Sequence, residues 1–591
     1  MTFKAPVAEI AFALRQAGLE RLITDGLYPD LSMDLVQAVL EEAGRFSGER
    51  IAPLNRPGDV RGAVFEDGAV RMPEGWREVY REWAEAGWNG VTAPPAHGGQ
   101  GLPVMLGVAV EEMWNAAALA FGLGPLLTAG AVEALEAHAG ADLKAAFLDR
   151  LVSGEWTGTM NLTEPQAGSD LAAIRTRAER REDGTYRIFG TKIFITYGEH
   201  DLTDNIVHLV LARLPDAPPG TRGISLFAVP KFLVNPDGSL GPRNDLRCAG
   251  LEHKLGIHAS PTCVMVFGDG PGAVGYLVGE ENRGLNAMFT MMNNARLAVG
   301  IQGVAIAERA TQQAFAYAQE RRQGRAPGTP PGEMAPIAAH PDVRRMLLTM
   351  RGLTRASRAI CYACAEAIDR ARRDPDPERR RASQERANLL TPVAKAFSTD
   401  AGVEIASLGI QVHGGMGYIE ETGAAQHLRD ARIAPIYEGT NGIQAIDLVT
   451  RKLPQSDGRA VRAYIAELGE TARRVGAPNR PDFGRMAERV HDAVAALADS
   501  TEWMLGALSR QPEAALAGAA PYLRLFGLAA GGAALAEAAL EAAQGGNGED
   551  GAARIALARH FAEAHLPETR ALQAAVTEGY GGILDPAALA G

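Results

Sequence analysis

Cysteine is scarce in this chain. Four cysteines in 591 residues cannot form the dense disulfide framework that holds small secreted domains together. Cys361 and Cys364 form a C-x-x-C pair, but the pair lies in an alanine- and arginine-rich helical pattern, and no second pair completes a metal site. We therefore predict that both thiols are buried helix residues, that the protein holds no metal, and that it works in a reducing cytoplasm.

Long hydrophobic runs and an excess of basic charge are also lacking. The longest notable apolar run, Leu525–Ala536, has about 12 residues and is short of the roughly 18–20 that cross a bilayer. Residues 1–14 do not have the pattern of a secretory signal. The 59 Lys and Arg residues against 71 Asp and Glu residues give a net charge of −12. That balance argues against nonspecific binding to nucleic acid or to an anionic membrane.

Periodicity divides the chain into four parts. Residues 1–157 have mostly helical patterns, with a Gly/Pro-rich break expected around 53–58. Short β-rich runs with turn signals follow over 158–278 and are typical of a small antiparallel barrel or sandwich. Helical patterns return over 279–453 and continue through the alanine-rich residues 454–591. The long helices predicted in the third part are residues 282–322, 342–373 and 377–412.

Two segments of the β part are candidates for ligand binding. In Met160–Asp170, small hydroxyl side chains accompany a glycine that would let a ligand approach the backbone. In Lys192–Thr196, an aromatic residue stands two positions before a hydroxyl and could stack on a flat ring. Each segment also has a plainer interpretation, as a capped turn in the first case and as a strand with a core phenylalanine in the second.

Two further candidates lie in the helical part that follows. Residues 411–418 include three glycines within four positions, whose backbone amides could cradle phosphate. This loop is not the G-x-G-x-x-G fingerprint of a Rossmann domain, which we find nowhere in the chain. Glu438 lies in an apolar setting just before Gly439, where lost solvation would raise its pKa toward that of a useful base. The alternative is an acidic residue at a helix start, favoured by the helix dipole.

In this order and spacing, the four segments resemble the acyl-CoA dehydrogenase family over about residues 30–455. The resemblance implies an N-terminal helical domain, a middle β-barrel domain and a C-terminal four-helix bundle. FAD would lie between them, with part of its site supplied by a neighbouring subunit. The extra C-terminal helices resemble the long bacterial branch that includes dehydrogenases of 3-(methylthio)propanoyl-CoA. The expected fold is therefore mainly α with a central β domain and a C-terminal helical extension.

The resemblance also implies which residues hold the flavin ring. Met160, the backbone around Leu162, and Thr163 would lie on one side of the ring. Phe194 and Thr196 would lie on the other side.

Four more positions match family contacts to the phosphates of FAD. Arg321 corresponds to an arginine that binds the FAD pyrophosphate across a dimer. Gln411 and Gly415 correspond to positions at the adenine-side phosphates, and Thr440 to a further phosphate contact. Residues 322–325 depart from the family pattern, because a longer Pro/Gly insertion replaces an aromatic-containing loop.

The substrate side of the resemblance centres on Glu438, which falls on the catalytic base of the family. Ser169 and Arg296 correspond to CoA contacts, and Gly439 lies beside the base on the substrate side. Some family members carry the base on the long helix near the position of Ala295, which here has no carboxylate. That absence favours Glu438.

The activity implied by the resemblance is FAD-dependent α,β-dehydrogenation of an acyl-CoA thioester to a trans-2-enoyl-CoA, as in fatty acid β-oxidation. Glu438 would remove the α-proton while a hydride passes to flavin N5. The substrate would be 3-(methylthio)propanoyl-CoA or a fatty acyl-CoA, and the electron acceptor an electron-transfer flavoprotein. The protein would be a cytoplasmic homodimer.

Two alternative functions use the same fold. One is an acyl-CoA oxidase, which has the same base but passes electrons to oxygen. The other is a DNA-associated flavoprotein, which should need a basic face in the C-terminal part. Acidic residues are at least as frequent as basic ones over 454–591, and this counts against the second alternative.

Overall fold

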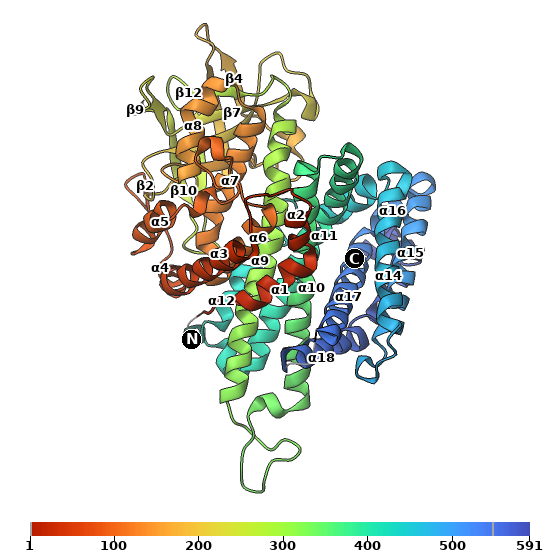
Figure 1. Ribbon diagram of the computed structural model, residues 1–591. Coiled ribbons are helices and arrows are strands. Elements are labelled where there is room, and N and C mark those ends of the chain that lie inside the picture. Colours follow the sequence, from red (N-terminus) through yellow and green to blue (C-terminus); the bar gives the residue numbers. More distant parts are fainter. Residues whose placement is uncertain (1–2, 546–548, 591) are drawn as a thin grey trace.

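The computed structural model describes residues 3–545 and 549–590 (Figure 1). Helices form the first part of the chain, strands the middle, and helices the remainder, with the last group of helices packed beside the central bundle. The predicted fold class, mainly α with a central β region and a C-terminal helical extension, is confirmed.

The N-terminal part is an assembly of helices with one small hairpin, β1 (Val64–Glu66) and β2 (Ala69–Arg71). The apolar helices α6 and α7 are almost completely buried. The helices are α1 (Val7–Ala17), α2 (Leu19–Thr24), α3 (Met33–Phe46), α4 (Ala52–Arg61), α5 (Trp76–Glu85), α6 (Val104–Ala117), α7 (Leu119–His138) and α8 (Ala141–Ser153).

The break predicted around residues 53–58 is wrong, because α4 runs through that segment. Pro53 lies near the start of α4, directly after the π-helical turn that precedes it, and has no N–H to donate to that turn. Pro57 lies inside the helix and removes one intrahelical hydrogen bond. A π-helical turn, Ser47–Ile51, joins α3 to α4, so the helical path continues where the composition suggests a loop.

The β region contains an eight-stranded sheet with strand order β10-β11-β5-β12-β7-β6-β3, in which β4 pairs with β5 and β6. A separate two-stranded sheet is formed by β8 (Phe232–Val234) and β9 (Leu240–Arg243). The long strand β5 pairs with β4, β11 and β12 along its length, so the sheet folds back on itself. Unlike the antiparallel arrangement expected, β3 pairs with β6 in parallel, because the chain returns through β4 and β5 before β6 begins. The strands used below are β3 (Thr157–Asn161), β4 (Arg177–Arg180), β5 (Tyr186–Thr196), β6 (Ile206–Arg213), β7 (Ile224–Pro230), β10 (Leu246–Leu251), β11 (Thr262–Phe267) and β12 (Ala273–Val278).

Three long helices form the centre of the bundle: α9 (Gly284–Glu320), α10 (Pro341–Arg373) and α11 (Pro377–His413). Two glycines of α9 permit an unusually close approach to α11. A Cβ on Gly300 would lie 2.7 Å from the carbonyl oxygen of Ala394, and one on Gly303 would lie 2.4 Å from that of Ser398. This contact fixes the spacing and register of the two helices that flank the candidate active site.

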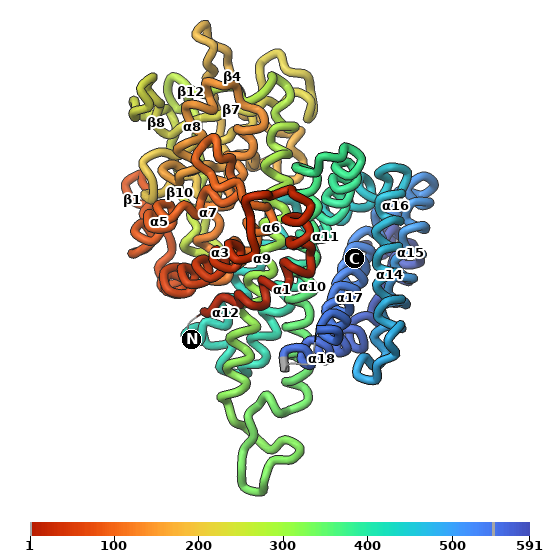
Figure 2. Tube along the Cα trace, viewed as in Figure 1, coloured from red at the N-terminus to blue at the C-terminus, as the bar shows by residue number. Residues whose placement is uncertain are grey.

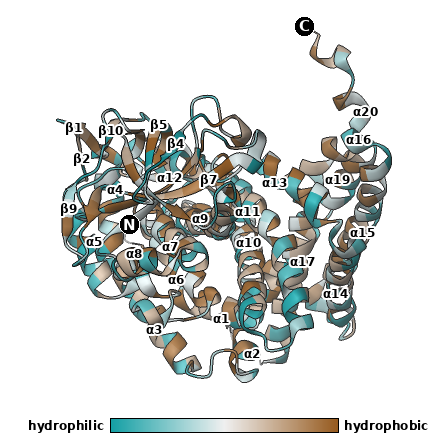
Figure 3. Ribbon diagram, turned by 90° about the horizontal axis from the view of Figure 1, so that it is seen from above, coloured by the Kyte–Doolittle hydropathy of each residue, from teal (hydrophilic) through white to brown (hydrophobic). Residues whose placement is uncertain are grey.

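A second group of helices, α14 to α20, lies to one side of the bundle (Figure 3). Its central helix α17 packs against the bundle through glycines, since a Cβ on Gly531 would lie 2.6 Å from the Cβ of Ala356. The helices are α14 (Arg459–Gly476), α15 (Met486–Arg510), α16 (Pro512–Ala517), α17 (Ala519–Gln544), α18 (Glu549–Ala564), α19 (Glu568–Thr577) and α20 (Tyr580–Ile583).

Two helices, α7 and α17, are long and apolar enough to cross a membrane by length and composition alone. The lengths of uninterrupted apolar runs in the sequence did not predict this. In each, 83% of the most apolar window is buried inside the protein. Both have the burial expected of core helices.

The first helix of the chain joins the bundle to the C-terminal helices (Figure 2). Glu9 on α1 forms ion pairs of 2.8 Å with Arg355 on α10 and with Arg554 on α18. Gln16 at the end of α1 donates a hydrogen bond to the carbonyl oxygen of Ala534 on α17. Segments from both ends of the sequence therefore pack against the same side of α10.

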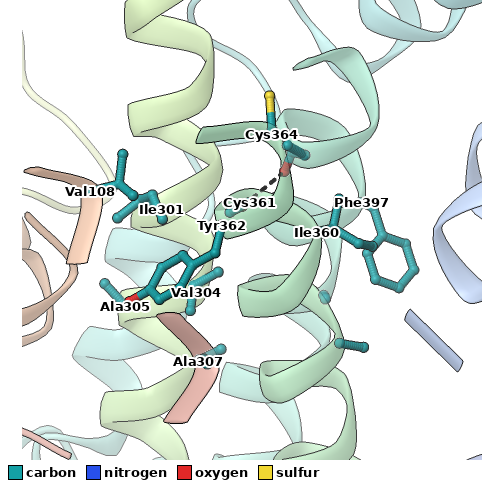
Figure 4. Packing of buried hydrophobic residues seen from close by; sticks show 14 of the residues in the cluster. Val108, Ile301, Val304, Ala305, Ala307, Ile360, Cys361, Tyr362, Cys364 and Phe397 are labelled. Carbon is teal, nitrogen blue, oxygen red and sulfur yellow. Dashed lines mark hydrogen bonds between the residues drawn. The ribbon is translucent and has the colours of Figure 1, made fainter. Parts of the chain in front are cut away.

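The C-x-x-C pair lies on α10 inside the core of the bundle (Figure 4). Cys361 and Cys364 are both free thiols with no exposed surface. Each sulfur contacts a backbone carbonyl oxygen of α11, that of Ala394 for Cys361 and that of Ala387 for Cys364. The prediction that they are buried helix residues is confirmed.

A buried ionic cluster joins the N-terminal helices to the bundle. Arg358 on α10 donates hydrogen bonds of 2.6 Å to Glu112 on α6 and of 2.9 Å to Glu308 on α9. Tyr362 donates a further hydrogen bond of 2.8 Å to Glu112. The side chains of Arg358 and Glu112 are each 1% exposed, so neither charge can be solvated by water if its partner is removed.

We expect the substitution Glu112→Ala to destabilise the protein by about 3–5 kcal/mol, because it leaves a buried guanidinium with only one carboxylate partner. Thermal unfolding of the purified variant measures the effect as a fall in Tm. The exposed pair Arg462–Glu502, with side chains 46% and 56% exposed, provides the control. Glu502→Ala should cost less than about 1 kcal/mol, and an equal loss in both variants would contradict the assignment.

Candidate active site

Hydrogen bonds bring the two candidate segments of the β region together. The ammonium of Lys192 at the bulged part of β5 donates 2.8 Å hydrogen bonds to the carbonyl oxygen of Leu162 and to the carboxylate of Glu164. The backbone N–H of Ile193 donates to the carbonyl oxygen of Thr163 at 3.0 Å. The loop that follows β3 is thereby fastened along the edge of β5.

The ion pair between Lys192 and Glu164 is buried, with side chains 0% and 4% exposed. Burial would raise the pKa of Glu164, but Lys192 and hydrogen bonds from Thr176 and from the backbone of Arg175 lower it to about 2. Burial lowers the pKa of Lys192 to about 8, although Glu164 opposes the shift. The sequence analysis assigned no role to Lys192 or Glu164. The feature that could have indicated one is the single lysine at the start of the β-rich segment Lys192–Thr196.

Phe194 is held in an unusual backbone conformation that exposes its ring. Its φ is +60°, and its side chain is 57% exposed. The pairing of β5 with β11 shifts register at this point, so that Ile193 and Phe194 form a β-bulge. A non-glycine residue rarely adopts positive φ, and such strain clusters at functional sites. The interpretation of Phe194 as a core residue is therefore wrong.

The remaining predicted residues of these segments lie around the bulge and the loop. Met160 is half-buried on β3 opposite Leu209 of β6. Thr196 is half-buried at the end of β5. Ser169 lies in an exposed turn beside Gly168, where an added Cβ would have no described atom within 4 Å. Packing within the described chain thus does not require a glycine at position 168.

Glu438 lies in the loop between α12 (Ala424–Ala431) and α13 (Asn441–Asp447). Its φ is +55° and that of Gly439 is +83°, so two consecutive residues occupy the left-handed region. The carbonyl oxygen of Glu438 accepts a 3.2 Å hydrogen bond from the side-chain amide of Gln444. That of Gly439 accepts one of 2.9 Å from the ammonium of Lys395.

The position of Glu438 decides against a helix-start acid. Thr440 is the N-cap of α13, and its hydroxyl accepts a hydrogen bond from the backbone N–H of Ile443 at 3.2 Å. Glu438 precedes this cap by two residues and so lies outside the first turn of the helix, where dipole stabilisation operates. Thr440 has a capping role whether or not it also contacts a phosphate.

The surroundings of Glu438 raise its pKa to about 7 through burial, while Arg296 and Lys395 oppose the shift. Arg296 on α9 is 6% exposed and lies 3.4 Å from the carboxylate of Asp447 on α13. The structure therefore brings Arg296 beside the candidate base. A carboxyl group with a pKa near 7 can accept a proton at neutral pH and hold it.

Sequence reasoning missed Lys395 on α11. This lysine is 0% exposed, and its ammonium also donates a 2.8 Å hydrogen bond to the side-chain oxygen of Asn441. Burial lowers the pKa of Lys395 to about 7, against the opposing charges of Glu438 and Asp400. The available signal was a single charged residue in the otherwise uncharged stretch Leu389–Phe397.

A third group of predicted residues lies where α9 and α11 end. Arg321 is exposed just beyond α9, and Gln411 and Gly415 are exposed at and after the end of α11. The two helix ends are held together by Tyr317 and His413, whose rings stack with centroids 4.4 Å apart.

This third group is remote from the candidate base within one chain. At a rise of 1.5 Å per residue, Arg321 lies about 37 Å along α9 from Arg296. Arg296 is the residue that approaches Glu438. A ligand that contacts Arg321 is therefore far from the Glu438 loop of the same chain.

The described residues fit a flavin nucleotide. Phe194 presents an exposed aromatic ring on which a flat ring system could stack. The loop that carries the half-buried Thr163 lies beside it, since the backbone of Thr163 is hydrogen-bonded to that of Ile193. At Gly414 and Gly415 an added Cβ would meet no described atom within 4 Å. These glycines are thus not required by packing among the described residues, and open glycine loops can bind phosphate through backbone amides.

Four family models together match most of the chain. They are acyl-CoA dehydrogenase N-terminal domain (residues 34–155), middle domain (159–269) and C-terminal domain (282–453), and acetyl-CoA dehydrogenase C-terminal like (460–585). The chain is also 49% identical over 586 residues to 3-methylmercaptopropionyl-CoA dehydrogenase of Ruegeria pomeroyi, with 98% of each chain covered.

Two solved structures share the fold at lower identity. Caenorhabditis elegans ACDH-11 in complex with C11-CoA is 21% identical, with a TM-score of 0.77 over 98% of this chain and 96% of that one. An acyl-CoA dehydrogenase of Bacillus anthracis complexed with FAD is 19% identical, with a TM-score of 0.75 over 93% and 89%. The family models and the close relative together establish that this chain belongs to the acyl-CoA dehydrogenase family, oxidoreductases whose cofactor is FAD.

Proposed function

We propose that Glu438 is the base with which this acyl-CoA dehydrogenase removes the α-proton of its thioester substrate. The observation that carries the proposal is the half-buried carboxyl group of Glu438, whose pKa burial raises to about 7. The strained turn that holds it supports the same role, since such conformations persist where the surrounding structure enforces them.

The α-proton of a thioester is weakly acidic, so its removal needs a desolvated base and stabilisation of the enolate oxygen. Glu438 supplies the base, and its backbone N–H would donate to the thioester oxygen. Bound FAD supplies the acceptor for the β-hydride. Phe194 and Thr196 would orient the flavin from one side, and Thr163 from the other. The product is a trans-2-enoyl-CoA.

We further propose 3-(methylthio)propanoyl-CoA as the preferred substrate. The support is the 49% identity to a 3-methylmercaptopropionyl-CoA dehydrogenase, which extends over 98% of both chains and includes the C-terminal helices. Ser169 and Arg296 would contact the CoA portion, and Gly439 would leave room for the acyl group beside the base.

We infer that the enzyme is a cytoplasmic homodimer in which Arg321, Gln411 and Gly415 serve the FAD of the partner subunit. The separation of about 37 Å between Arg321 and Arg296 along α9 supports this arrangement. Arg321 is exposed and donates within its own chain to Gln323 at 3.3 Å. An electron-transfer flavoprotein would accept the electrons.

The variant Glu438→Gln should fold and keep FAD but lose at least about 10²–10⁴-fold in kcat, because an amide cannot take the α-proton. Rapid anaerobic mixing with acyl-CoAs, followed by the visible absorbance of the flavin over time, measures the loss as a slower rate of flavin reduction. Glu513→Gln on the exposed surface of α16 is the control, and its flavin should be reduced at the wild-type rate. Wild-type flavin reduction in Glu438→Gln would refute the assignment of the base.

The pH dependence of kcat/KM should follow the ionisation of Glu438 in the free enzyme. Because the base must be deprotonated, kcat/KM should rise with pH and level off above pH 7, in line with a pKa raised to about 7. Below that value it should fall about tenfold per pH unit. Steady-state rates from pH 5 to 9 test this, and an acid limb near pH 4.5 would contradict the burial of the base.

A panel of acyl-CoAs tests the substrate and the electron acceptor together. We expect 3-(methylthio)propanoyl-CoA to give the highest kcat/KM, above butanoyl-CoA and longer fatty acyl-CoAs. In air, turnover should yield far less than one peroxide per product, whereas stoichiometric peroxide would identify an acyl-CoA oxidase. A higher kcat/KM for a long-chain acyl-CoA would overturn the proposed substrate.

A further inference from the structure

We propose that Lys395 is a positioning residue of the proton-abstraction site, which holds the Glu438–Gly439 turn in place and favours the ionised form of the base. The proposal rests on the function proposed for Glu438. It adds a residue on a different element, α11, to that site.

The contacts of Lys395 are directed at the turn. Lysine is almost never fully buried unless it is paired, yet Lys395 has no exposed surface. Its ammonium donates to the carbonyl oxygen of Gly439 at 2.9 Å and to the side-chain oxygen of Asn441 at 2.8 Å. Both acceptors lie within three residues of Glu438, and neither is a carboxylate. A lysine buried for the sake of an ordinary ion pair would not have these partners.

The turn needs such anchoring because its backbone is unfavourable. Glu438 has a φ of +55° without being glycine, and Gly439 follows at +83°. The carbonyl oxygens of both residues accept hydrogen bonds from buried donors, Gln444 for the first and both Lys395 and Gln444 for the second. Fixing both carbonyls fixes the peptide planes on either side of Gly439, and the first of these planes is attached to the Cα of Glu438.

Asn441, which accepts a hydrogen bond from Lys395, is also bonded to the next turn of α11. Its side-chain nitrogen donates to the carboxylate of Asp400 at 2.7 Å and to the hydroxyl of Thr399 at 3.0 Å. Thr399 lies four residues after Lys395, on the same face of the helix. One face of α11 is therefore hydrogen-bonded to the loop from Gly439 to Asn441.

The charge of Lys395 acts on the base directly. Lys395 and Arg296 both lower the pKa of Glu438 against the effect of burial. The pKa of Lys395 is in turn raised by the charges of Glu438 and Asp400 and lowered by that of Arg296. Three charged or titratable groups act on the pair directly: Arg296 on α9, Asp400 on α11 and Tyr437 in the loop. Further charges act on these groups in turn: Asp447 and Arg451 on Arg296, and Arg432 and Arg524 on Asp400.

Two substitutions in the holoenzyme separate charge from anchoring. Lys395→Gln removes the charge but keeps a donor for Gly439 or Asn441. We expect its acid limb of kcat/KM to move up by about one pH unit, because the cation that favours the carboxylate is gone. The rate one unit below the wild-type midpoint should then fall about tenfold, while the high-pH plateau stays near that of the wild type.

Lys395→Met removes both charge and donor. It should show the same upward shift of the acid limb together with a lower kcat at every pH, with KM changed less than kcat. Lys254→Met is the control, since Lys254 is half-buried and, like Lys395, donates to a backbone carbonyl, that of Ser260, at 3.0 Å. The control should keep the wild-type pH profile and kcat.

The outcomes separate this inference from the proposed function. Absence of flavin reduction by any acyl-CoA in the wild type would remove the proposed function. A wild type that turns over, an inactive Glu438→Gln and a Lys395→Gln with an unshifted acid limb would remove only the role of Lys395. Since Lys395→Gln alone tests the shift, a failure of Lys395→Met to fold leaves the inference testable.

Discussion

The close contact between α9 and α11 is the constraint on which the candidate active site depends. Gly300 and Gly303 let α9 approach the backbone of Ala394 and Ser398 to a distance that no side chain would permit. Arg296 projects from α9 and Lys395 from α11 near this contact, and both lower the pKa of Glu438. A larger residue at either glycine would separate the two cations from the carboxylate and weaken their effect on it.

The two halves of the site share one construction. In each, a non-glycine residue is held at positive φ, Phe194 at +60° and Glu438 at +55°. In each, a lysine with no exposed surface donates to backbone carbonyls of the neighbouring loop, Lys192 to Leu162 and Lys395 to Gly439. A buried ammonium resists displacement, because moving it would leave a charge without hydrogen-bond partners in a medium of low polarity. The two buried lysines thus stabilise the loops that adjoin Phe194 and Glu438.

Periodicity predicted the long helices well because most of their stabilisation comes from burying one face. The expected helices at 282–322, 342–373 and 377–412 correspond to α9, α10 and α11 with ends shifted by only a few residues. The break expected around 53–58 was wrong because a π turn joins α3 to α4 without a loop and the helix continues past both of its prolines. Composition alone does not distinguish a proline that a helix accommodates from one that ends it.

The sequence by itself determined the family, the order of helical and β parts, and the identity of the candidate base, because these depend on residue types and spacing along the chain. It did not reveal the roles of Lys192, Lys395, Gln444 and Asn441, since their partners are distant in sequence or lie in a turn whose backbone shape no local pattern predicts. Only the tertiary structure decided that Glu438 lies before the cap of α13, half-buried between two cations. The pKa of a carboxyl group depends on which charges and how much water surround it, and folding sets both through contacts between distant segments.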